Sequence, residues 1–161
     1  MPTVASPVRT TIVNAAFLQE VKESNFVLWE VLNDLRELAR SKDFSNVAIH
    51  KFVSQLASLR DGIGVQFSLE ETYGFFEGVP RFAAIAMGNA KHARDQHREL
   101  YLHLHEICER AEEAQYRGTI ARDLPIFLGA FEGFDDAFRA HEQLEAELIR
   151  TGLGLSRFGG G

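Results

Sequence analysis

The chain has little of what secreted, membrane-spanning and nucleic-acid-binding proteins depend on. Its 161 residues include one cysteine, Cys108, which excludes an intrachain disulfide framework and is typical of a reducing compartment. The first 20 residues lack the basic and apolar regions of a secretory signal, and no stretch approaches the roughly 18 apolar residues of a membrane span. Basic residues form no run, and 17 Lys and Arg against 23 Asp and Glu give a net charge of −6, which argues against nucleic-acid and anionic-membrane partners. These absences predict a soluble cytoplasmic protein.

Helical periodicity covers nearly the whole chain, without an alternating strand pattern between the periodic stretches. With 45% hydrophobic and 25% charged residues, the composition is that of a globular chain, and its length fits one domain. The helical periodicity predicts that this domain is all-α. Ser45 is expected to cap the second helix, Gly78 and Pro80 to end it, and Asp123 to cap the fourth, with a break of the third left open near residues 87–89. An N-terminal extension (1–11) and a flexible Gly-rich tail (153–161) flank the predicted helical domain (12–152). The four helices are expected at about residues 12–40, 46–77, 81–115 and 123–152.

Each predicted helix carries an apolar residue every three or four positions, which is typical of the inward-facing seam of an up-down-up-down antiparallel four-helix bundle. In such a bundle two residues lie at the same depth when the midpoint between them falls in the connecting loop. The midpoints of residues 25 and 66, of 66 and 97, and of 97 and 141 all fall in predicted loops. One polar layer inside the bundle is therefore expected. It contains the six polar residues that interrupt the seams: Asn25, Gln66, Glu70, His97, His141 and Glu145.

Two carboxylates in such a layer need compensation, because an unpaired ionised group in an apolar core costs several kcal/mol. Lys and Arg are absent from all four seams, so no cationic side chain is expected there. A metal cation would satisfy both glutamates and use the imidazoles as neutral nitrogen ligands, a mixed set that suits iron, manganese or zinc. The alternative is a metal-free network in which Glu70 or Glu145 is protonated and hydrogen-bonds Asn25, Gln66 and a histidine.

The spacing of the polar residues repeats along the chain. His97, His141 and Glu145 are separated by 44 and 4 positions, and Asn25, Gln66 and Glu70 by 41 and 4. A lone histidine followed, in the next helix, by His-x-x-x-Glu resembles the hemerythrin-like, or HHE cation-binding, domain. The resemblance covers about residues 12–150.

In that family each half usually supplies two histidines and a glutamate that bridges two irons. The resemblance therefore implies a complete second half and a degenerate first half, because Asn25 and Gln66 stand where the family has histidines. Amide oxygens bind transition metals poorly. A single ion is expected, with Glu142 as a candidate extra ligand. The predicted metal ligands are Glu70, His97, His141 and Glu145.

The resemblance implies a non-haem iron protein that senses, binds or stores oxygen, nitric oxide or iron, with zinc or manganese as other candidate ions. No nucleophile has a general base beside it, so no catalytic residue is predicted and an enzyme is not favoured. The alternative function is that of a metal-free degenerate bundle that serves as a structural or protein-interaction module. The sequence leaves the oligomeric state open.

The remaining histidines carry weaker signals. His103 and His105 lie two positions apart on a helix, so their side chains point in different directions and cannot share an ion. His50 and His92 lie off the seams and are expected at the surface. The Phe-rich stretch 127–138 is interpreted as core, with a dry channel to the metal as the alternative.

Overall fold

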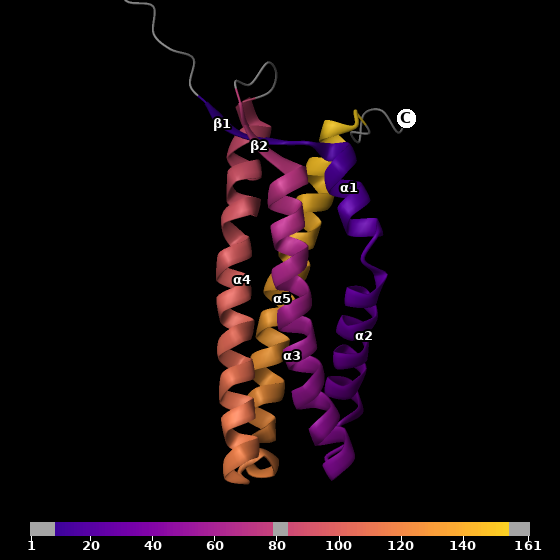
Figure 1. Cartoon of the computed structure of the whole chain (residues 1–161), viewed down its shortest axis with the longest axis vertical. Helices are drawn as coiled ribbons and strands as arrows, with labels where there is room; N and C mark the ends of the chain where they lie inside the picture. The colour runs from indigo at the N-terminus through magenta and orange to yellow at the C-terminus, as the bar shows by residue number, and fades with distance from the viewer. Residues whose placement is uncertain (1–8, 79–83, 155–161) are drawn as a thin grey trace, which may run out of the picture.

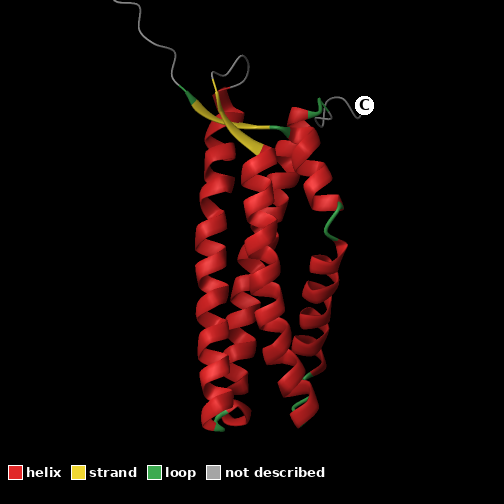
Figure 2. Cartoon of the chain, viewed as in Figure 1, coloured by secondary structure: helices red, strands yellow, loops and turns green. Residues whose placement is uncertain are grey.

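The structure, a computed structural model, describes residues 9–78 and 84–154. The described chain is mostly helical, with one small antiparallel ribbon of two strands (Figures 1 and 2). No helix among the described residues is long and apolar enough to cross a membrane. Parts of the predicted extension and tail, residues 1–8 and 155–161, lie outside the described residues. The elements are β1 (Thr10–Val13), α1 (Ala15–Glu23), α2 (Phe26–Ser41), α3 (Asn46–Leu69), a π-helical turn (Glu70–Gly74), β2 (Phe75–Gly78), α4 (Ala84–Arg117) and α5 (Ile120–Gly152).

The helices lie alongside one another, and the ribbon crosses one end of the assembly (Figure 1). Along the chain α2 packs on α3, α3 on α4 and α4 on α5, while α1 packs on the π-helical turn and on α5. The predicted all-α class therefore fits the structure apart from the ribbon. The N-terminal segment α1 consequently lies beside the C-terminal helix, although the two are far apart in the sequence.

The prediction of one continuous first helix over residues 12–40 is wrong. Residues 12 and 13 belong to β1 and not to its first turn, and the helix that follows is broken at Ser24 and Asn25 into α1 and α2. Ser24 ends α1 and its hydroxyl donates to the Val21 carbonyl (3.1 Å), while Asn25 has φ −110° and starts α2. Ser and Asn side chains compete with helical hydrogen bonds in this way. The break turns the last residues of α1 toward the neighbouring helices.

The end of the predicted second helix is also wrong. The α-helix stops at Leu69, a π-helical turn follows, and residues 75–78 pair with β1 instead of remaining helical to Glu77. Gly74 lies against α1, where an added Cβ would come within 3.3 Å of the Leu18 Cα, and its carbonyl accepts from the Asn14 amide (2.7 Å). This contact lets the chain leave the helix and form the ribbon. The predicted stop at Pro80 lies outside the described residues.

Other predicted boundaries have mixed outcomes. Ser45 caps α3 as expected, since its hydroxyl accepts from the Ala48 amide (3.2 Å). Helix α4 is continuous through residues 87–89, so the break considered there is absent. Asp123 does not start α5, because Gly118, with φ +75°, makes the turn alone and the helix begins at Ile120.

The buried apolar residues fall into two clusters. The larger one contains the phenylalanines of α5 from Phe127 to Phe138, which confirms their interpretation as core. The smaller one, near the ribbon, is built on Leu18, Phe75 and Leu148. On α5 the larger cluster ends at Phe138 and the smaller begins at Leu148, and His141 and Glu145 lie between them. These two polar residues thus lie in a layer between two apolar clusters.

Candidate metal centre

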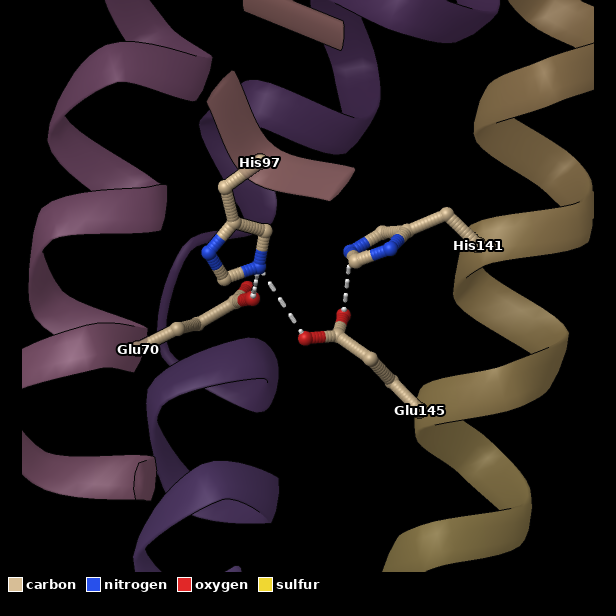
Figure 3. Close-up of side chains that lie close together, drawn as sticks. All are labelled: Glu70, His97, His141 and Glu145. Atoms are coloured by element: carbon tan, nitrogen blue, oxygen red, sulfur yellow. Dashed lines mark hydrogen bonds and ion pairs between the residues drawn. The ribbon is translucent and has the colours of Figure 1, made fainter. Parts of the chain in front are cut away.

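Two carboxylates and two imidazoles converge in this layer (Figure 3). Glu70 comes from the π-helical turn, His97 from α4, and His141 and Glu145 from α5. Each offers one ligand atom, and these atoms all lie within 4.8 Å of one another. His97 is 3% exposed and the other three are fully buried. The expectation that these four side chains meet in one layer is therefore confirmed.

Local helix geometry explains how the cluster forms. His141 and Glu145 are four residues apart on α5 and so share one face, with Nε2 and Oε1 3.0 Å apart. Glu70 is four residues after Gln66, whose Nε2 donates to Glu70 Oε2 (2.7 Å). Glu70 also opens the π-helical turn, a local change of helix geometry that often occurs at functional sites.

The atoms that face the centre of the cluster are close together but poorly hydrogen-bonded. His97 Nε2 lies 3.1 Å from Glu70 Oε1 and 3.3 Å from Glu145 Oε2. Glu70 Oε1 and His141 Nε2 are buried and have no hydrogen-bond partner. Leaving such an atom unpaired costs about 1–3 kcal/mol, and more for a charged group. A cation placed between them would contact all of these atoms.

Neighbouring side chains fix the orientation of both imidazoles. His141 Nδ1 lies 2.8 Å from Gln96 Oε1, so Nδ1 carries the proton that Gln96 accepts and the lone pair of Nε2 faces the cluster. The His97 ring stacks on Phe67, with ring centroids 4.2 Å apart and planes 10° apart. Gln96 was not singled out from the sequence, because it is half-buried and belongs to no apolar seam.

A cationic side chain enters the layer, which corrects the expectation that none is available. Lys22 Nζ, on α1, lies 3.5 Å from Glu70 Oε2 and 2.9 Å from Glu142 Oε2, and it forms an ion pair with Glu145 Oε1. The Lys22 side chain is 13% exposed. Lys22 does not belong to the apolar seam, but the break after α1 and its long aliphatic stem allow its ammonium to reach the carboxylates.

The charges of the layer reinforce one another. Burial disfavours the ammonium of Lys22, but the negative charges of Glu145, Glu70 and Glu142 outweigh this effect and raise its pKa. Burial likewise disfavours the charged imidazolium of His97, yet its hydrogen bond to Glu145 and its close contact with the Glu70 carboxylate raise its pKa to about 9. A metal ion must therefore displace a proton from His97 at neutral pH.

The two glutamates of α5 differ in their environment. Burial would raise the pKa of Glu145, but its close contacts with His141 and His97, together with the Lys22 charge, hold it well below its usual range. The pKa of Glu142 is raised, because burial outweighs the attraction of Lys22. Glu142 pairs with Lys22, is 26% exposed and stands outside the four-residue cluster. Its proposed role as an extra ligand stays a prediction.

Asn25 and Gln66 form a hydrogen-bond chain that leads to Glu70. Asn25 Nδ2 donates to Gln66 Oε1 (2.8 Å), and Gln66 in turn donates to Glu70. Gln66 is buried in the layer as expected, whereas Asn25 is half-buried at the start of α2 and is not the mid-helix seam residue that was predicted. Gln66 thus orients the Glu70 carboxylate, and Asn25 orients Gln66.

The other histidines lie apart from the cluster. His50, His92 and His103 are exposed, as predicted. His105 stacks on Tyr101, with centroids 6.1 Å apart, and its Nε2 lies 3.6 Å from Glu109 on the same helix. None of the four belongs to the group that could hold an ion.

Comparisons of the chain with protein families, with curated proteins and with solved structures found no match. The resemblance to the hemerythrin-like domain therefore stays a prediction from the sequence. The geometry of the four buried ligand atoms is the finding on which a functional proposal must rest.

Proposed function

We propose that the chain is a metal-binding protein that holds one transition-metal ion through Glu70, His97, His141 and Glu145. The observation that carries this proposal is the convergence of one ligand atom from each of these four buried side chains within 4.8 Å, among which Glu70 Oε1 and His141 Nε2 have no hydrogen-bond partner. Two imidazole nitrogens and two carboxylates suit iron, manganese or zinc, and iron is the expected ion. The Gln96 contact that orients His141 supports the proposal, since metal-bound histidines are usually held by such a partner.

The charges of the layer support a divalent ion. When ionised, Glu70, Glu142 and Glu145 carry three negative charges, against one positive charge on Lys22. Two negative charges then remain beside two neutral imidazoles. A divalent cation brings the sum to zero, which favours binding in a layer where unbalanced charge is costly.

The order of the helices supports a wider proposal, that α1–α2, α3, α4 and α5 form an up-down-up-down hemerythrin-like bundle. Within this proposal the protein senses, binds or stores oxygen, nitric oxide or iron. A bound iron ion would supply coordination of a small diatomic ligand. The chain's own contribution would be to fix His97 and His141 and to exclude water, because Phe67 and Phe138 lie against these imidazoles.

One observation favours the second candidate function, a metal-free bundle that acts as a structural or interaction module. Lys22 and Gln66 already contact the buried carboxylates, so the layer is partly compensated by the protein itself. Glu70 Oε1 and His141 Nε2 weigh against this alternative, since Lys22 and Gln66 reach only Glu70 Oε2 and Glu145 Oε1 and leave these two buried atoms without hydrogen bonds.

Histidine variants separate the two functions. We expect His97→Ala and His141→Ala to lose the metal of the wild-type protein, because each removes one of two nitrogen ligands, whereas His103→Ala and His105→Ala keep it. Elemental analysis of protein purified without chelator measures the content, and circular dichroism verifies that each variant is folded. Equal loss from both pairs, or equal retention, would contradict the assignment of the ligands.

A further inference from the structure

We propose that the Lys22 ammonium occupies a cation position of its own beside the metal centre and keeps a second metal ion out of it. The inference rests on the proposed function, since it names what limits the metal content of the same site. It assigns to Lys22 a role that the four-ligand proposal does not contain.

The surroundings of Lys22 Nζ are those of a bound cation. Oxygen atoms of Glu70, Glu142 and Glu145, from the π-helical turn and from α5, lie within 3.5 Å of the nitrogen. Carboxylate oxygens gathered from separate elements are also the ligands that hard divalent cations take. The ammonium is the group that fills this space, with its side chain only 13% exposed.

The two buried glutamates are shared between Lys22 and the histidines. Glu70 presents Oε1 to His97 (3.1 Å) and Oε2 to Lys22 (3.5 Å). Glu145 presents Oε2 to His97 (3.3 Å), while its Oε1 lies between His141 and Lys22. Each carboxylate thus connects the ammonium with the centre of the histidine cluster. Two carboxylates shared in this manner could equally connect two metal ions.

Lys22 is held in place by the following helix, α2. The Lys22 carbonyl accepts from Trp29 Nε1 (3.0 Å), a bond that spans the break between α1 and α2, and Nζ lies 6.0 Å from the Trp29 ring centroid. A cation tethered next to its carboxylates has a high effective concentration there. A free metal ion must displace the Lys22 ammonium to bind at this position. Because the ammonium is tethered, it competes with the free ion at a high effective concentration.

The experiment measures how many Mn²⁺ ions each variant binds by equilibrium dialysis, with electron paramagnetic resonance to distinguish isolated from magnetically coupled ions. Lys22→Ala opens the position, and Lys22→Gln opens it while keeping a polar side chain. Lys22→Arg keeps the charge. Lys91→Ala is the matched control, because Lys91 also pairs with an acidic residue, Asp95, but is exposed on α4.

We expect the Mn²⁺ content to rise about twofold in Lys22→Ala and Lys22→Gln, from one ion per chain to two. The paramagnetic resonance spectrum of an isolated Mn²⁺ ion should then give way to that of two magnetically coupled ions. Lys22→Arg and Lys91→Ala should stay at the wild-type Mn²⁺ content.

If the wild-type protein binds no ion and Lys22→Ala binds one, the proposed function fails and the inference that Lys22 occupies a cation position stands. If wild type and both Lys22 variants bind one ion, the inference is overturned and the proposed function stands. The inference would also be overturned if both variants failed to fold and added Mn²⁺ did not restore folding. A free cation would then be unable to replace the ammonium.

Discussion

Replacing Glu145 by glutamine is expected to lower the free energy of unfolding of the metal-free protein by about 3–5 kcal/mol, the cost of breaking a buried ion pair. Glu145 is fully buried and contacts Lys22, His97 and His141. The amide has nearly the same shape but no charge. Both Lys22 and His97 would then lose the carboxylate that compensates their burial, while the packing of α5 stays nearly unchanged.

Glu142→Gln is the matched control, since Glu142 is on the same helix and pairs with the same lysine but is 26% exposed. Its replacement should cost clearly less, because the burial that raises the pKa of Glu142 already offsets the attraction between its charge and Lys22. Urea denaturation in the presence of chelator measures both variants. If both variants lost a similar, small amount of unfolding free energy, the buried Lys22–Glu145 pair would contribute no more to stability than the Lys22–Glu142 pair. The metal content of Glu142→Gln also decides whether Glu142 is an extra ligand.

Supplying metal should stabilise the wild-type protein strongly. A ligand that binds the folded state alone, at about a hundredfold excess over its dissociation constant, adds about 2.7 kcal/mol. For a chain of this length such a gain raises the melting temperature by roughly 5–10 °C. Thermal unfolding with Fe²⁺ under anaerobic conditions, or with Mn²⁺ or Zn²⁺, measures the shift.

The double variant His97→Ala/His141→Ala provides the reference for this measurement, since it lacks both nitrogen ligands and should show no shift. Non-specific binding of metal to the acidic surface would instead shift the melting temperatures of both proteins by the same amount. If none of the three ions raised the melting temperature of the wild-type protein, the result would favour the alternative function, a metal-free interaction module.

The sequence predicts the long helices and the central cluster well. The seams of α3, α4 and α5 repeat over many turns, so their period is unambiguous and the depth of each polar residue follows from the loop positions. His97, His141, Glu70 and Glu145 therefore meet as expected. The cap at Ser45 is also predicted, because its hydroxyl serves the first free amides of α3.

Short elements and long side chains explain what the sequence does not reveal. Strands β1 and β2 are four residues each and pair across more than 60 positions, so neither shows a clear alternation by itself. The break at Ser24 depends on local hydrogen bonds that do not alter the apolar period. Lys22 escapes a seam analysis because its Cα lies beside the seam while its ammonium reaches into the layer.

The surroundings of Glu70 leave no free space for a second ion. Asn25 and Gln66 form a hydrogen-bond chain to Glu70, and the ammonium of Lys22 contacts the same carboxylate oxygen as Gln66. Introducing histidines at positions 25 and 66 would leave this ammonium in place. A second ion would therefore require the replacement of Lys22 as well.

The metal content of the wild-type protein tests the central claim most directly. Protein purified without chelator, and a sample incubated anaerobically with Fe²⁺ and then dialysed, are compared by elemental analysis against protein concentration. The account predicts close to one transition-metal ion per chain, because the histidine cluster offers one position and Lys22 fills the other. Two irons per chain, or none after incubation with Fe²⁺, would contradict it.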